Sequence, residues 1–210
     1  MRIYTGPLSL FAKKVQIAAR EKNLALEVAP VPFNMHDQYR QKHPEVVRIN
    51  PKQQVPVLVD GDLELFDSTV ICEYFEDLQA QPPLWPSDPR ARAHARLWEL
   101  KVDEVLAPEV IALMDPQARE TPALAKPHHT RIQAFYFTVD EVLDTCSYLA
   151  GDFSYADIAM YITHYFAGLL GAKIPETMPN LRRWRKEMEQ RESVQAETDS
   201  MREYLQKHVA

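Results

Sequence analysis

The fold is decided by one stretch near the start of the chain, Tyr4-Thr-Gly-Pro-Leu-Ser-Leu-Phe-Ala-Lys-Lys-Val15. It joins a short apolar strand, residues 2–4, to a helix predicted over residues 10–23, whose apolar side chains recur at helical spacing. A second strand is predicted over residues 26–31. Because strand–helix–strand units cross over with one hand and pair their strands in parallel, the stretch predicts the start of an α/β domain.

The next fifty residues complete this domain. A second, short helix is predicted over residues 39–48. Two strands, residues 56–59 and 63–66, flank Asp60-Gly61, which is a strong signal for a hairpin turn. A helix over residues 68–78 follows. The predicted order is βαβ, then a helix, then ββα, and the domain spans residues 1–79.

A proline-rich stretch, Gln81-Pro-Pro-Leu-Trp-Pro-Ser-Asp-Pro89, cannot continue a helix and predicts a linker over residues 80–89. Only helices are predicted beyond it, so residues 90–210 form an all-helical domain. Pro108 is expected to kink or break the first of these helices, and Ser154 with Asp157 has the form of a capping box. The helices are predicted over residues 90–113, 123–149, 154–170, 179–190 and 193–206.

Composition and charge exclude several classes of protein. The net charge of −6, without a basic stripe, argues against a general affinity for nucleic acid. No apolar run approaches the roughly 20 residues that a membrane helix needs, and the N-terminal sequence has no signal-peptide core. We therefore expect a cytoplasmic protein without nucleic-acid or membrane partners. The two cysteines have neither metal-ligand nor disulfide spacing, and Cys72 reads as a packed apolar residue.

Four features at fixed separations together resemble the cytosolic glutathione S-transferases of the bacterial, serine type. They are the opening stretch quoted above, Asn50-Pro51 followed by Val55-Pro56, Phe66-Asp67-Ser68 leading into a helix, and Phe153-Ser154-Tyr-Ala-Asp157. The resemblance covers essentially the whole chain. It implies a thioredoxin-like N-terminal domain, an all-helical C-terminal domain, a homodimer, and glutathione as co-substrate.

The resemblance identifies Ser9 as the catalytic serine, which donates a hydrogen bond to the glutathione thiolate. A free thiol has a pKa of about 8.5, and lowering it by roughly two units means stabilising the thiolate by about 2.7 kcal/mol. A hydroxyl donor and a helix N-terminus can supply this. From its spacing alone, Ser9 is equally well explained as a helix cap. Thr5 and Tyr4 are rivals for the role, although Tyr4 is better explained as core packing.

Two further sites for glutathione follow from the resemblance. Val55-Pro56 resembles the cis-proline site, where the Val55 backbone pairs with the cysteinyl unit. Asp67-Ser68 begins a helix whose N–H groups suit the γ-glutamyl carboxylate, with Asp67 attracting the ammonium group. Without the resemblance, the first is a plain turn and the second a plain N-cap.

Lys42 and Gln54 match residues that hold the glycyl carboxylate in related classes, although Lys42 is equally well explained as a solvated lysine. Gln53 departs from the family pattern, which often has glycine there. The second substrate, a small hydrophobic electrophile, is expected near Phe11, Asp103, Met114 and Tyr165. No metal or nucleotide is expected, because His128-His129 lacks partners with ligand spacing.

The predicted reaction is attack of the glutathione thiolate on a hydrophobic electrophile. Peroxide or disulfide reduction, dehalogenation and isomerisation use the same activated sulfur and stay open. A non-catalytic binding or regulatory protein of the same fold is the alternative from another class.

Overall fold

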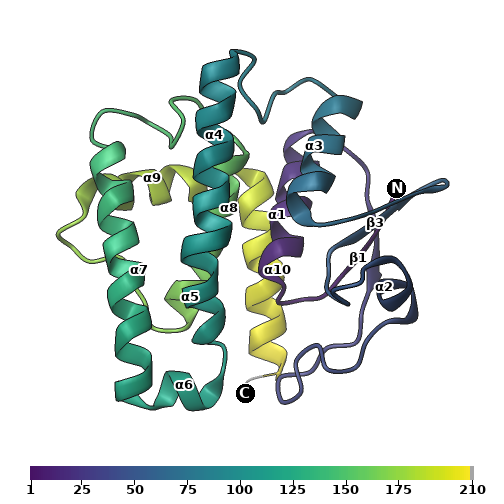
Figure 1. Cartoon of the computed structure of the whole chain (residues 1–210), viewed down its shortest axis with the longest axis horizontal. Helices are drawn as coiled ribbons and strands as arrows, with labels where there is room; N and C mark the ends of the chain where they lie inside the picture. Colours follow the sequence, from purple (N-terminus) through teal and green to yellow (C-terminus); the bar gives the residue numbers. More distant parts are fainter. Residues whose placement is uncertain (209–210) are drawn as a thin grey trace. The chain divides into compact units, whose positions relative to one another are not determined.

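The computed structural model describes residues 1–208 of the 210-residue chain, which divide into two compact units (Figure 1). One unit contains Met1–Pro82 together with the chain from Arg191 on, and the other contains Pro83–Gln190. The division at residue 82 falls inside the predicted linker. The C-terminal helix, however, groups with the first unit, whereas the sequence prediction placed it in the helical domain.

The first unit is a four-stranded sheet with helices. Its strands lie in the order β2-β1-β3-β4, with β1 parallel to β2 and antiparallel to β3, and β3 antiparallel to β4. The parallel crossover and the hairpin at Asp60-Gly61 are therefore confirmed. The elements are β1 (Arg2–Thr5), α1 (Leu10–Glu21), β2 (Glu27–Pro30), α2 (Pro44–Ile49), β3 (Val57–Asp60), β4 (Leu63–Phe66), α3 (Ser68–Leu78) and α10 (Glu192–His208).

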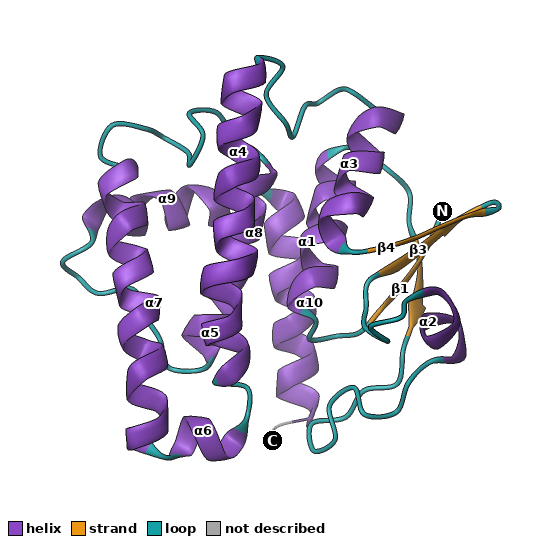
Figure 2. Cartoon of the chain, in the orientation of Figure 1, coloured by secondary structure: helices purple, strands orange, loops and turns teal. Residues whose placement is uncertain are grey.

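Helices cover both faces of this sheet. Helices α1 and α3 lie on one face and α2 on the other (Figure 2). Under α2, a small apolar cluster joins the helix to the strands through Tyr4, Val31, Val46 and Val57, all buried. The mixed sheet with helices, followed by a helical region, confirms the predicted fold class.

Helix α2 is shorter than predicted, since residues 39–43 are outside it. It begins at Pro44, where the ring of a proline suits the first helical position and its missing N–H costs nothing. The residue before a proline is pushed out of the helical region, so His43 is extended and caps the helix. Its Nδ1 accepts the Glu45 N–H at 3.2 Å.

The second unit is built from helices. They are α4 (Pro89–Lys101), the π-helix η1 (Val102–Leu106), α5 (Ala107–Ala112), α6 (Pro116–Glu120), α7 (Pro122–Val142), α8 (Tyr155–Leu169) and α9 (Pro179–Glu189). The break expected at Pro108 takes the form of η1, because proline has no N–H to donate to the preceding turn. Helix α7 ends at Val142 and not at residue 149. The chain beyond it turns at Gly151 (φ 95°), and the Leu149 N–H donates to Asp157 instead of to a helical carbonyl.

Asp157 anchors this unit from the first turn of α8. Its carboxylate accepts the Ser154 N–H at 3.0 Å and the Ser154 hydroxyl at 3.1 Å, and also the Leu149 N–H and the Trp184 indole N–H, both at 3.0 Å. Full burial raises the pKa of Asp157 to about 6, and the four hydrogen bonds act against that rise. The capping box predicted at Ser154 and Asp157 is therefore present, and it extends to two further donors.

A buried histidine on the same helix makes the protein sensitive to acid. The Nδ1 of His164 lies 3.1 Å from the Tyr136 hydroxyl, and burial lowers the pKa of His164 to about 3. On acidification the unfolded chain takes up this proton first, starting near pH 6.5. The free energy of unfolding should therefore fall by about 1.4 kcal/mol for each pH unit below about 6.5, or about 2 kcal/mol by pH 5.

We predict that the His164→Asn protein does not show this fall in the free energy of unfolding, because asparagine does not titrate. The measurement is urea unfolding of both proteins between pH 5 and 8, and the difference between them isolates His164 because Asp157 contributes to both. If the free energies of unfolding of the wild type and the variant differ by the same amount at every pH, the prediction is wrong.

Candidate active site at the end of the sheet

The register of the strands gathers the predicted glutathione residues of the first unit at one end of the sheet. β1 ends there at Thr5, and the next residues lead to Ser9. Because Tyr4 pairs with Val57, and Val57 with Phe66, both the turn before β3 and the turn after β4 lie at this same end. These two turns contain Val55-Pro56 and Asp67-Ser68. The loop after β2 also starts there, since Thr5 pairs with Pro30.

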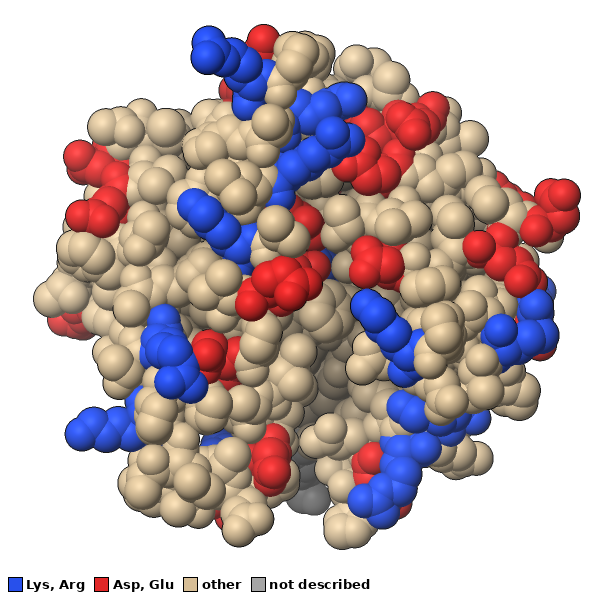
Figure 3. Space-filling view, in the orientation of Figure 1, with Lys and Arg blue, Asp and Glu red and all other residues tan. Residues whose placement is uncertain are grey.

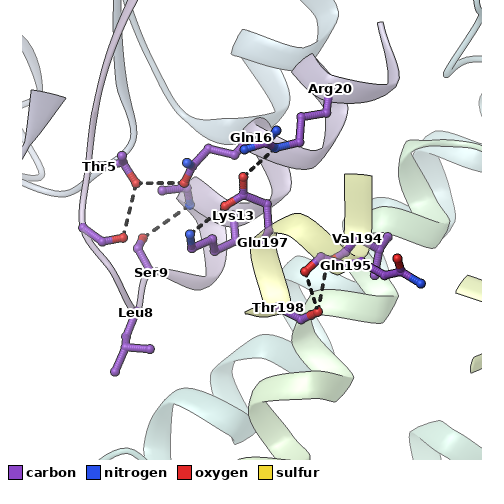
Figure 4. A network of polar contacts seen from close by, with 12 residues as sticks. Thr5, Leu8, Ser9, Lys13, Gln16, Arg20, Val194, Gln195, Glu197 and Thr198 are labelled. Atoms are coloured by element: carbon purple, nitrogen blue, oxygen red, sulfur yellow. Dashed lines mark hydrogen bonds and ion pairs between the residues drawn. The ribbon is translucent and has the colours of Figure 1, made fainter. Parts of the chain in front are cut away.

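Ser9 is the N-cap of α1 and is 7% exposed. Its backbone is extended, and its hydroxyl oxygen accepts the Ala12 N–H at 3.3 Å (Figure 4). A serine hydroxyl has one proton to donate besides its acceptor lone pairs. Capping uses only an acceptor, so Ser9 can cap α1 and still donate to an anion in front of the helix. The two interpretations of Ser9 are thus compatible.

The rivals of Ser9 point elsewhere. Tyr4 is buried in the apolar cluster beneath α2 and lies 4.9 Å from the His43 ring. Thr5 is buried, and its hydroxyl lies within hydrogen-bond distance of the Gly6 carbonyl at 3.4 Å and of Gln16 Oε1 at 3.3 Å (Figure 4). Both side chains are therefore engaged inside the unit.

The turn before β3 has the backbone that a peptide ligand needs. The Val55–Pro56 peptide is cis, as the resemblance implies. Within residues 1–208 no backbone hydrogen bond engages Val55, so its N–H and C=O are available to an extended ligand. Gln53 has a φ of 53°, in the left-handed region. This region favours glycine, which the family pattern led us to expect there, and glutamine adopts it in this chain.

The turn after β4 is held by Asp67, which adopts a φ of 77° and caps α3. Its carboxylate accepts the Thr69 N–H at 3.0 Å and the Val70 N–H at 3.3 Å. An incoming carboxylate would therefore meet the Ser68 N–H and hydroxyl, because the next two N–H groups are already bonded. Ser68 is buried and Asp67 exposed. Two non-glycine residues with positive φ, Gln53 and Asp67, thus flank Val55-Pro56, and such strain clusters at functional sites.

The two residues predicted for the glycyl carboxylate, Lys42 and Gln54, are both exposed. Gln54 belongs to a loop that Asn50 organises. The Asn50 amide donates to the Gln54 carbonyl at 2.6 Å and accepts the Lys52 N–H at 2.9 Å. Lys42 lies in the loop just before α2, and its contact with a ligand stays a prediction.

A buried ion cluster behind Ser9 was not predicted from the sequence. Lys13, one turn after Ser9, is 3% exposed, and its ammonium lies 2.7 Å from Glu197 of α10 (Figure 4). Glu197 is 2% exposed and also accepts from Arg20 Nε at 2.8 Å. This cluster joins α1 to α10, which is why the C-terminal helix belongs to the first unit. The pattern that could have revealed it is a lysine within the apolar face of the α1 sequence.

A tyrosine in the loop after β2 was also missed. The Tyr39 hydroxyl accepts the Leu8 N–H at 3.3 Å. A Cβ added to Gly6 would lie 2.2 to 2.6 Å from the tip of the Tyr39 ring, so any side chain there would force the ring to move. Nothing in the irregular sequence around Tyr39 indicates that its ring reaches the turn before Ser9.

The residues predicted for the electrophile belong to different units. Phe11 lies on α1 in the first unit, with the Lys14 ammonium 5.0 Å from its ring. Asp103 is in η1, Met114 follows α5, and Tyr165 stacks on Tyr161 within α8. A pocket formed by these residues stays a prediction.

The described residues also bear on metal binding, membrane spanning and surface charge. No cluster of three metal-ligating side chains occurs in residues 1–208, and His128 instead pairs with Glu109 at 2.6 Å. No helix in this range has both the length and the apolar character to cross a membrane. On the face shown in Figure 3, basic and acidic side chains are interspersed.

Both parts of the chain match family models of one enzyme family. Residues 3–83 match the glutathione S-transferase N-terminal domain, and residues 103–192 match the glutathione S-transferase C-terminal domain.

Individual relatives span nearly the whole chain. A stringent starvation protein A homolog of Coxiella burnetii is 28% identical over 93% of this chain and 90% of its own. Glutathione S-transferase 2 of Saccharomyces cerevisiae is 29% identical over 92% of this chain and 88% of its own.

Solved structures agree with this. Gtt2 of Saccharomyces cerevisiae superposes with a TM-score of 0.81 at 25% identity, covering 94% of this chain and 100% of that chain. A glutathione S-transferase of Methylobacillus flagellatus with GSH bound gives a TM-score of 0.80 at 25% identity, covering 93% and 98%. With its thioredoxin-like sheet, helical second unit and both matching domains, the chain belongs to the glutathione S-transferase family.

Proposed function

We propose that this protein is a glutathione transferase that binds glutathione at the end of the sheet and activates its thiol as the thiolate. The observation that carries this proposal is the Ser9 hydroxyl at the start of α1, which caps the helix as an acceptor and keeps its proton to donate. The positive end of α1 adds to the stabilisation of the anion. The thiol proton passes to solvent, and the sulfur then attacks the electrophilic carbon of the second substrate.

The other predicted residues bind the rest of the tripeptide. The backbone of Val55, beside Pro56, pairs with the cysteinyl unit. Ser68 holds the γ-glutamyl carboxylate, and Asp67 attracts the ammonium. Lys42 and Gln54 bind the glycyl carboxylate. Phe11, Asp103, Met114 and Tyr165 are the proposed contacts of the hydrophobic electrophile. The enzyme works as a cytoplasmic homodimer in detoxification without metal or nucleotide.

Ser9→Ala tests the proposal. Losing a hydrogen bond to a charged group costs about 1.5–3 kcal/mol, so kcat/KM for conjugation of glutathione to an aryl halide should fall roughly 10- to 100-fold. Ser9→Thr keeps a hydroxyl and should retain most of the activity. Since Ser9→Ala also removes a helix cap, thermal unfolding of both variants is measured alongside. Equal kcat/KM in the wild type and Ser9→Ala would remove the catalytic role of the serine.

One observation favours a second candidate. The similarity to the stringent starvation protein A homolog keeps open a non-catalytic binding or regulatory protein of the same fold. Titration calorimetry with millimolar glutathione at two temperatures tests the transferase, which must bind glutathione, and no heat at either temperature would favour the non-catalytic protein. The same protein, tested with peroxides, disulfides and halides, then distinguishes conjugation from reduction, dehalogenation and isomerisation.

A further inference from the structure

The Tyr39 hydroxyl is part of the turn that leads into Ser9. It accepts the N–H of Leu8, the residue directly before Ser9, and its ring tip rests on Gly6, where a side chain would displace the ring. The phenol oxygen lies 3.3 Å from the backbone nitrogen of Leu8, and the Ser9 hydroxyl caps the helix that begins at the residue after it. Both hydroxyls therefore lie at the start of α1.

This hydroxyl has a proton that the protein does not use. A phenol can both donate and accept, and with Leu8 it only accepts. Within residues 1–208 no acceptor for the Tyr39 O–H is found. Burial raises the pKa of Tyr39, so the phenol keeps its proton at neutral pH and is a donor, not a base.

The ring is held from behind by other aromatic side chains. Phe33 lies 4.5 Å from the Tyr39 ring between centroids, and Tyr204 of α10 lies 5.7 Å from Phe33. This packing, together with the contact at Gly6, fixes where the hydroxyl points without using its proton. A preorganised donor of this kind is what stabilises developing or resident negative charge in an active site.

We propose that Tyr39 is a second catalytic hydroxyl, which donates its O–H to the glutathione sulfur anion that Ser9 binds. The inference rests on the proposed function, because it needs glutathione at the start of α1. No bond to Tyr39 forms or breaks, and the thiol proton still leaves to solvent. Tyr39 and Ser9 then share the stabilisation of the thiolate.

The test is Tyr39→Phe, which keeps the ring and removes only the hydroxyl. The ionisation of bound glutathione is followed by the ultraviolet absorbance of the thiolate as pH is raised. Loss of one charge-assisted hydrogen bond should raise the pKa of the bound thiol by about one unit, a tenfold lower ionisation constant. At pH 7 a rise of the thiol pKa from about 6.5 to about 7.5 lowers the thiolate fraction about threefold, so kcat should fall about threefold, with KM for glutathione changing less. Tyr74→Phe, whose hydroxyl donates to Asp60 at the opposite end of the sheet, should leave the thiol pKa unchanged.

A second substitution covers the case in which Tyr39→Phe folds poorly. Replacing Tyr39 by 3,5-difluorotyrosine keeps its size and makes the phenol a stronger donor, so the pKa of the bound thiol should fall. An unchanged thiol pKa in both variants, with changes only in stability or KM, would overturn the role of Tyr39 while leaving Ser9 in place. A wild-type protein that binds no glutathione, or binds it with the pKa of the free thiol, would instead overturn the proposed function itself.

Discussion

Asp157→Ala is expected to destabilise the helical unit by about 4 kcal/mol, a large share of the roughly 5–15 kcal/mol that keeps a protein folded. The carboxylate receives four donors, from Ser154, Leu149 and Trp184, and the site is fully buried. Alanine would leave these donors without an acceptor and without access to water. Each unsatisfied buried donor costs about 1–3 kcal/mol, with partial relaxation making the total less than the sum.

Two further variants show whether the loss comes from these hydrogen bonds. Asp157→Asn keeps one acceptor oxygen for Leu149 and Trp184 but turns an amide donor toward Ser154, so it should lose about half as much. Asp152→Ala, at an exposed position five residues earlier, should change the free energy of unfolding by less than about 0.5 kcal/mol. The measurement is urea unfolding followed by tryptophan fluorescence, since Trp184 donates to the site. An Asp157→Ala protein as stable as Asp152→Ala would contradict this account of the unit.

The second large effect is expected at Glu197. Glu197→Ala would leave the ammonium of Lys13 buried without an anion, and breaking a buried pair in this way costs about 3–5 kcal/mol. Arg20 is 54% exposed and can turn to water, so the cost comes from Lys13. Because the pair joins α10 to α1, the variant should also release the C-terminal helix. We expect faster amide hydrogen exchange and earlier proteolysis in α10.

The matched double variant Lys13→Met with Glu197→Leu removes both buried charges and should recover most of the lost stability. Glu203→Ala, on the exposed face of the same helix, serves as the surface control and should be close to neutral. If the double variant were as unstable as Glu197→Ala, the loss would arise from packing and not from an unpaired charge.

Local patterns predicted most of the fold. The apolar spacing after Ser9 predicted α1, Asp60-Gly61 predicted the hairpin, and the capping box predicted the start of α8 to within one residue. The differences from the prediction had two sources, one local and one distant in sequence. Helix α2 was predicted too early because the capping role of His43 before Pro44 was overlooked. The place of α10 depends on Lys13 meeting Glu197, 184 residues away, which no local pattern encodes.

The residues of the candidate site also differ in whether a local sequence pattern identifies them. Ser9, Val55, Pro56, Asp67 and Ser68 are recognisable because each belongs to a turn or helix start with its own sequence pattern, and the strand register then brings these turns together. Tyr39 lies in an irregular loop, and its position depends on the space left by Gly6. A residue that reaches the site only because of how its side chain packs has no local sequence pattern, so a single sequence does not identify it.

The ionisation of glutathione bound to the protein tests the central claim most directly. Titrating the thiolate absorbance of the bound tripeptide should give a pKa roughly two units below the value of about 8.5 for a free thiol, and Ser9→Ala should raise it by about one unit or more. A bound thiol that ionises at the same pH in the wild type and in Ser9→Ala would contradict the claim.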